Sequence, residues 1–410
     1  MPRRQGYALL IALVAGTAVL AAAVAFGTSY LTGTRHAHLG RGAAHPAAHN
    51  PAAPATSTGT WVATWTGAPV SGEPHTEHGF PGRTIRNTVH TSIGGHAARI
   101  TLSNLFGTVP LVIDQATVAA RPVTFRGAAA VSIPAGRQVV SDPVAVVVPA
   151  DADLQVALRT SGPGGPVTYH PNSHQTSYMA TQPTTSWRYL TAVDVRTDSK
   201  AAATVVVLGD SLTAGTGSTT DTNSRWPDVL SDRLRHRYGI ANQGIAGNRL
   251  LRDGTRPSGG PSGISRYERD VLSVAGAKTV IIALGINDVQ QAPRERDPQH
   301  IVNGLRTLTA EAHARGIRVV GATLMPFRGY ATWTPGREAV RRAVNERIRA
   351  GGVFDAVLDF DRAVRDPYAP DRLLPAYDCG DRLHLNDNGY RMLGRSIDLR
   401  SLTGAPAYAF

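Results

Sequence analysis

The chain has 410 residues and a formal net charge of +12, from 42 lysines and arginines against 30 acidic residues. Lys200 and Lys278 are the only lysines, so we attribute the charge to the arginine-rich coding of a high-GC genome. A surface that attracts anionic polymers or membranes is the alternative. No basic run is interleaved with aromatic residues, so nucleic-acid binding is not expected. The single cysteine, Cys379, excludes an internal disulfide and is interpreted as a small buried thiol.

Residues 1–34 have the composition of an export segment. Arg3 and Arg4 precede an uncharged stretch whose apolar centre runs from Ala8 to Phe26. One interpretation is a signal peptide that is cut near Ala23-Val24-Ala25. The other is a signal anchor, because the apolar run is long enough to span a bilayer with the arginines on the cytoplasmic side. Both place the rest of the chain outside the cytoplasm, either secreted or anchored to the outer face of the membrane.

Residues 35–59 are rich in Ala, Pro, His and Thr and have too little hydrophobic bulk to pack, so we predict a disordered linker. Its histidines are irregularly spaced, which favours a solvated tether over a metal site. They are His36, His38, His45 and His49.

Residues 60–198 show short runs of period-two alternation and predict a β-sandwich-like domain. Ile100 and Leu102 alternate with polar neighbours, and Gly94-Gly95 predicts a tight hairpin between the strands that flank it. We expect this domain to cover one side of the domain that follows, with glycan binding as the alternative. Tyr169, His170 and His174 lie in a loop-like segment and are interpreted as structural. Further predicted strands are Val123–Phe125, Ala130–Ile133, Val144–Val148 and Leu154–Leu158.

Residues 199–410 alternate strand and helix patterns, which predicts a doubly wound parallel sheet. Buried strands are expected at Val205–Leu208, Ile240–Ala241, Thr279–Leu284, Arg318–Thr323 and Val357–Leu358. Helices are expected from a Ser224 cap to Gly239, around Ile301–Ala312, from Thr334-Pro335 to Gly351, and after Asp387-Asn388.

Ser211 follows the first of these strands within Gly209-Asp210-Ser211-Leu212. A serine there lies at the edge where open α/β sheets bind ligands, and its hydroxyl needs a base to become a nucleophile. His384 supplies a base, and Asp381, three residues earlier, can hold its other ring nitrogen. Gly247 and Asn287 each follow a predicted strand and offer a backbone N–H and a side-chain amide to a developing oxyanion.

These four blocks, in this order, resemble the SGNH (GDSL) hydrolase family. The resemblance implies a flavodoxin-like doubly wound fold with Ser211 as nucleophile and Asp381 and His384 as its acid–base pair. It also implies an oxyanion hole formed by Ser211, Gly247 and Asn287. The β-rich region resembles that of an actinobacterial-type branch with xylan-acetyl-esterase-like members. The segments that carry this second resemblance are Thr84–Ser92, Arg99–Gly107 and Ser141–Val144.

The resemblance implies a serine esterase that hydrolyses short acyl esters, with acetylated polysaccharide as the expected substrate. A lipase or phospholipase is the alternative within this class, and a glycan-binding envelope protein with a vestigial hydrolase domain is the alternative outside it. The sequence has no H-E-x-x-H, P-loop or G-x-G-x-x-G motif, so no metal or cofactor is expected. It also has no G-x-S-x-G elbow, which argues against an α/β-hydrolase fold. Contact with a membrane is expected only through residues 1–34.

Overall fold

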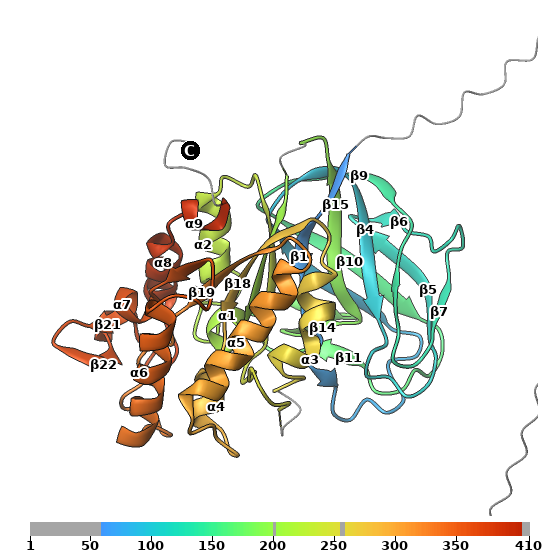
Figure 1. Ribbon diagram of the computed structural model, residues 1–410. Coiled ribbons are helices and arrows are strands. Elements are labelled where there is room, and N and C mark those ends of the chain that lie inside the picture. The colour runs from blue at the N-terminus through green and yellow to red at the C-terminus, as the bar shows by residue number, and fades with distance from the viewer. Residues whose placement is uncertain (1–58, 200–201, 255–258, 404–410) are drawn as a thin grey trace, which may run out of the picture. The chain divides into compact units, whose positions relative to one another are not determined.

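The computed structural model describes residues 59–199, 202–254 and 259–403 (Figure 1). The predicted export segment and all of the predicted linker except Gly59 lie outside these ranges. The described residues belong to one compact unit that begins at Ser57. Within them, no helix is both long and apolar enough to cross a membrane.

The first half of this unit contains antiparallel sheets, as expected for the β-rich region. The first sheet has five strands. Four of them follow the order β1 (Thr60–Thr66), β15 (Leu190–Thr197), β4 (Gly95–Ser103) and β8 (Gln138–Val140), and the fifth, β9 (Val144–Val148), also pairs with β4. The second sheet has the strand order β13 (Gln182–Thr184), β12 (Ser177–Met179), β3 (Thr84–Thr91), β10 (Ala152–Thr160), β5 (Leu111–Val118) and β6 (Arg121–Pro122). Strand β7 (Val131–Ile133) also pairs with β5. A small third sheet contains β14 (Trp187–Arg188), β11 (Thr168–His170) and β2 (Ser71–Gly72).

The predicted hairpin at Gly94-Gly95 is wrong. Strand β3 pairs with β10 and β12, whereas β4 pairs with β15, β8 and β9, so the glycines connect two different sheets. In both strands buried residues alternate with more exposed ones, and the buried faces share one hydrophobic core that includes Val89 and Ile100. Burying both faces against each other keeps the strands in opposite sheets.

The predicted strand at Val123–Phe125 is also wrong, because only an isolated bridge forms there, between Phe125 and Ala128. Pro122 ends β6 and lacks the N–H that a longer ladder would need. The carboxylate of Asp142 then accepts hydrogen bonds from the N–H groups of Arg126 and Gly127, which fixes a turn in place of a strand.

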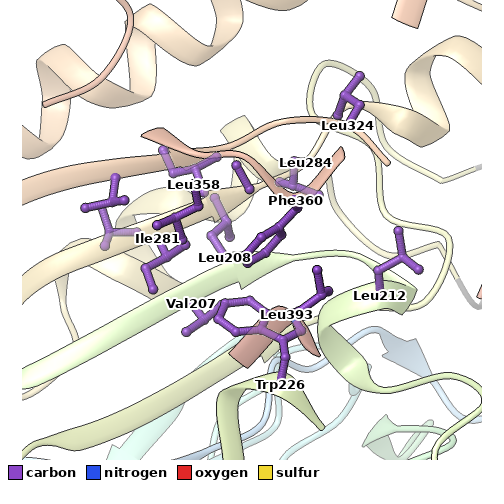
Figure 2. Packing of buried hydrophobic residues seen from close by; sticks show 14 of the residues in the cluster. Val207, Leu208, Leu212, Trp226, Ile281, Leu284, Leu324, Leu358, Phe360 and Leu393 are labelled. Carbon is purple, nitrogen blue, oxygen red and sulfur yellow. The ribbon is translucent and has the colours of Figure 1, made fainter. Parts of the chain in front are cut away.

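The second half contains the predicted parallel sheet. Its order is β17 (Gly239–Gly244), β16 (Thr204–Gly209), β18 (Ala277–Ala283), β19 (Arg318–Ala322) and β20 (Ala356–Leu358), and all neighbours are parallel. This order reverses direction at β16, as in flavodoxin-like sheets, so the carboxyl ends of β17, β16 and β18 lie side by side. Val207, Leu208 and Ile281 pack into the apolar core shown in Figure 2.

Two groups of helices accompany this sheet. Helix α8 (Asp387–Ser396) packs on α2 (Trp226–Arg233) and α7 (Phe360–Val364), and α5 (Pro298–His313) packs on α3 (Gly263–Tyr267) and α6 (Pro335–Arg349). The helix predicted from a Ser224 cap to Gly239 is shorter than expected: Arg225 precedes α2 and pairs with Asp228, and Gly239 begins β17. The remaining helical segments and the last strand pair are α1 (Ser211–Ala214), η1 (Glu268–Leu272), α4 (Ile286–Gln290), η2 (Pro375–Tyr377), α9 (Arg400–Thr403), β21 (Arg365–Asp366) and β22 (Ala369–Leu373).

The β-rich region meets the parallel sheet through β1. Strand β1 packs against β17, and Ala63 of β1 is fully buried in the same hydrophobic core as β16. The N–H of Ala63 donates to Thr204 Oγ1 at 3.0 Å, and Thr204 Oγ1 donates to the carbonyl of Ala275 at 2.7 Å. These contacts tie the two regions together at the base of β16. The domain division at residues 198 and 199 stays a prediction.

Candidate active site

Gly209, Asp210 and Ser211 turn the end of β16 into the short helix α1. Asp210 Oδ1 accepts a hydrogen bond of 2.9 Å from the N–H of Leu212, which caps the helix. A Cβ atom at Gly209 would lie 2.0 Å from Thr213 Oγ1, so a glycine is required beneath the turn. Ser211 is thereby held at the carboxyl edge of the central strand.

The structure brings Ser211, His384 and Asp381 together. Ser211 Oγ lies 2.9 Å from His384 Nε2, and His384 Nδ1 lies 2.5 Å from Asp381 Oδ2. With Asp381 accepting the Nδ1 proton, Nε2 is the nitrogen that can take a proton from the serine hydroxyl. The arrangement can therefore perform nucleophilic acyl transfer.

The loop before α8 holds the acid–base pair in place. Asp381 Oδ1 accepts hydrogen bonds from the N–H groups of Leu383 and His384 at 2.9 and 2.8 Å. Burial acts to raise the pKa of Asp381, but the hydrogen bonds from His384 and the neighbouring backbone outweigh it and lower that pKa below its ordinary value. The carboxylate therefore stays ionised. The ring of Tyr330 lies edge-on to the His384 ring, with centroids 6.3 Å apart, and borders the triad.

Gly247 and Asn287 lie on the loops after β17 and β18, the two neighbours of β16. Gly247 has a φ of +76°, a conformation that favours glycine. Asn287 Nδ2 donates one proton to the carbonyl of Asn248 at 2.9 Å, and its Oδ1 accepts from Gln291 Nε2 at 3.0 Å. Gln291 Nε2 also reaches the carbonyl of Gly247 at 2.9 Å. These bonds orient the amide and leave its second proton for a ligand.

Two N–H groups at the same edge lack a partner. Among the described residues, no hydrogen bond uses the N–H of Ser211 or Gly247, whereas the N–H groups of Leu212 and Asn248 are both bonded. Free N–H groups beside an oriented amide are donors suited to an oxyanion.

Arg266 supports this edge of the sheet and was not identified from the sequence. Its buried guanidinium donates to the carbonyls of Gly209 and Gln243, at 3.0 and 2.8 Å, and to Asn248 Oδ1 at 3.0 Å. Asp270 pairs with it at 3.1 Å. Arg266 therefore connects the ends of β16 and β17 to the loop that contains Gly247. A lone arginine in the sequence carries no signal of this role.

Asp288 fixes the same loop from the other side. Its carboxylate oxygens accept hydrogen bonds from the N–H groups of Leu250 and Leu251 at 2.7 and 3.0 Å. Burial raises the pKa of Asp288 despite these bonds. Its position directly after Asn287 in Gly285-Ile286-Asn287-Asp288 was the only signal available in the sequence.

Cys379 differs from expectation, because its side chain is exposed. It lies in the surface loop that carries Asp381, where there is no core to bury it. Partial desolvation and the nearby carboxylates raise the pKa of the thiol, so it remains protonated and is a poor nucleophile.

Comparison with known proteins agrees with this geometry. Residues 207–392 match the model of the GDSL-like Lipase/Acylhydrolase family, a range that contains all five predicted site residues. Together with the strand order, this match identifies the SGNH-hydrolase fold. A search of curated proteins returned no match.

Solved structures to which this chain is similar include an inhibitor-bound M. smegmatis aryl esterase, with 20% identity, a TM-score of 0.40, and coverage of 49% of this chain and 99% of that chain. A carbohydrate acetylesterase family member from Sinorhizobium meliloti has 20% identity, a TM-score of 0.41, and coverage of 50% and 100%. A GDSL-like lipase from Bacteroides thetaiotaomicron has 18% identity, a TM-score of 0.37, and coverage of 49% and 89%.

Proposed function

We propose that this chain, whose residues 207–392 match the GDSL-like Lipase/Acylhydrolase family model, is an extracytoplasmic serine esterase for short-chain acyl esters. The observation that carries the proposal is the connected series Ser211 Oγ, His384 and Asp381, with separations of 2.9 and 2.5 Å.

Ser211 Oγ attacks the ester carbonyl carbon while His384 Nε2 takes the hydroxyl proton. Asp381 holds the ring by Nδ1 and stabilises the imidazolium that forms. His384 then gives its proton to the leaving alcohol as the carbon–oxygen bond of the ester breaks. In the second half, His384 activates a water molecule, which attacks the acyl-serine and releases the acid.

The negative charge that develops on the carbonyl oxygen needs donors that are already in place. The N–H groups of Ser211 and Gly247 and the free Nδ2 proton of Asn287 fill this role. Arg266 and Asp288 contact no reacting atom and act by holding the loop that presents Gly247.

The proposed acyl group is small, and acetyl is the first choice. The bulky ring of Tyr330 beside His384 favours a short acyl chain at the triad. Acetylated polysaccharide is the proposed natural substrate. Export rests on Arg3, Arg4 and the apolar stretch Ala8–Phe26, which lie outside the described residues.

The test is hydrolysis of p-nitrophenyl esters from acetate to palmitate, run beside acetate release from acetylated xylan. The proposal predicts the highest kcat/KM for acetate or propionate, with acetate released from the xylan. A preference for long chains would replace it with a lipase or phospholipase. Absence of turnover on every ester, with glycan binding retained, would favour an envelope protein with a vestigial hydrolase domain.

A further inference from the structure

A cluster of metal-ligating side chains lies where the β-rich region faces α2, apart from the triad. We name it the interface cluster: His90 of β3, Asp151 of the turn between β9 and β10, and Asp232 and His236 at the end of α2. All four residues line a cavity of about 300 Å³. None of them is in the triad or the oxyanion loops.

Three ligand atoms of the cluster converge without hydrogen-bonding to one another. His236 Nε2 lies 3.8 Å from Asp151 Oδ2 and 4.0 Å from Asp232 Oδ1. These separations are too long for hydrogen bonds. They are close to the roughly 3–4 Å between two atoms that share one ion at about 2.1 Å each. His90 Nε2 adds a fourth atom, which hydrogen-bonds to Asp151 Oδ1 at 3.0 Å, so an ion bound there would take the place of the shared proton.

Polar groups next to Nδ1 orient both imidazole rings. His236 Nδ1 lies 3.3 Å from Ser231 Oγ, which donates to the carbonyl of Ser92 at 3.4 Å. His90 Nδ1 lies 2.9 Å from Asp153 Oδ1 and 3.0 Å from Asn223 Nδ2. A partner on the far nitrogen fixes the ring and presents Nε2, as outer-shell groups do for metal-bound histidines.

A third histidine faces the same cavity. His170 is 6% exposed, and its Nδ1 lies 2.7 Å from the carbonyl of Ala68. Among the described residues, no hydrogen bond uses its Nε2. The cavity therefore also contains the ring of a largely buried histidine that is held through its Nδ1.

We propose that Asp151, Asp232 and His236, with His90 as the fourth ligand, bind a divalent transition-metal ion of the Zn²⁺ type. Two imidazole nitrogens and two carboxylates suit zinc, whereas magnesium and calcium prefer oxygen ligands alone. The two carboxylates also match the charge of the ion. Since the ligands come from both regions, the ion joins the β-rich region to α2.

The site is structural, so its effect is on stability and not on chemistry. An ion that binds only the folded chain raises the melting temperature as its concentration rises above the dissociation constant. Asp232 and His236 are four residues apart, but His90 and Asp151 come from distant segments that only the fold brings to them, so no motif could have predicted this site.

The test measures zinc by elemental analysis after the full-length chain is freed of metal with a chelator, dialysed against micromolar Zn²⁺ and then against buffer. The variants are His236→Ala and, because it preserves shape, Asp151→Asn. The control is His313→Ala, since His313 pairs with Asp355 at 3.0 Å on the surface and, among the described residues, the pair belongs to no group of three potential ligands. All four proteins contain the histidines of residues 35–59, which can also bind zinc. The site is therefore tested by the difference in zinc content between the proteins.

We expect wild type and His313→Ala to retain one more zinc ion per chain than His236→Ala or Asp151→Asn. Zinc should raise the melting temperature of the first pair by a few degrees and leave the second pair unchanged. Equal zinc content and equal shifts in all four proteins would overturn the site. A stabilisation by Mg²⁺ as large as that by Zn²⁺ would overturn the assignment of metal class.

Discussion

Asp210 has an unfavourable environment next to the proposed nucleophile. It is almost fully buried, and burial raises its pKa from 3.8 to about 7, even though Leu212 donates a hydrogen bond to it. Between pH 4 and 7 the folded protein therefore holds a proton that the unfolded chain releases. Stability is lost as the pH rises through this window.

We predict that Asp210→Asn stabilises the protein at pH 8 and has little effect at pH 4. The asparagine oxygen can still accept from Leu212 but carries no charge. The difference in the free energy of unfolding should grow with pH to a few kcal/mol, at most about 4 kcal/mol, since one pKa unit is worth about 1.4 kcal/mol. Urea unfolding at both pH values measures it. A difference independent of pH would contradict the account.

Asn287 is expected to act on the transition state. Its amide is oriented by Asn248 and Gln291, and the charge it meets exists mainly after attack on the carbonyl. We predict that Asn287→Ala lowers kcat by about 10²–10³, with a much smaller change in KM. Steady-state kinetics and the melting temperature should be measured on the same preparation. An unchanged kcat beside a lowered melting temperature would assign Asn287 a structural role alone.

At the scale of elements, Arg266 links three segments whose relative position determines where the Gly247 N–H points. We predict that Arg266→Lys lowers kcat more than it raises KM, because an ammonium group cannot reproduce the fork that reaches Gly209, Gln243 and Asn248 at once. Stability should also fall, since buried carbonyls lose their donors.

The matched control is Arg341→Lys. Arg341 is equally buried, and it pairs with Glu338 and Asp361 and bonds to no residue of the triad or oxyanion loops. The Arg341→Lys variant should be less stable than wild type, while its kcat per folded molecule should be unchanged. Similar losses of kcat in both variants would show that Arg266 acts only through general stability.

The elements that the sequence predicted correctly are those with a local cause. A run of β-branched residues followed by Gly209 and Ser211 specifies a buried strand and its end without knowledge of the rest of the fold. The Gly94-Gly95 turn was misinterpreted because a turn specifies a change of direction and not which sheet receives the next strand. Arg266 was missed because its partners lie on four separate segments of the chain.

At the scale of the whole molecule, Ala63 of the β-rich region lies in the core of the parallel sheet. We therefore expect the region from Gly59 onward to unfold in one transition. Thr204→Val should lower the free energy of unfolding by about 1–3 kcal/mol, because it removes two hydrogen bonds of Thr204 Oγ1, one from the N–H of Ala63 and one to the carbonyl of Ala275. Thr307→Val is the control, because Thr307 is exposed and its Oγ1 donates to the carbonyl of Asn303 within the same helix, α5.

Scanning calorimetry of the three proteins measures this directly. A single transition, shifted down in Thr204→Val and unshifted in Thr307→Val, is expected. Two transitions, of which Thr204→Val moves only one, would show that the two regions are thermodynamically independent.

The central claim is that Ser211 attacks an ester carbon with His384 as its base. The most direct test is the rate of p-nitrophenyl acetate hydrolysis by Ser211→Ala, after circular dichroism shows that the variant is folded like wild type. The account predicts a kcat lower by about 10³-fold or more, because the nucleophile is gone and only the oxyanion donors and binding remain. Hydrolysis by the folded variant at the wild-type rate would contradict it.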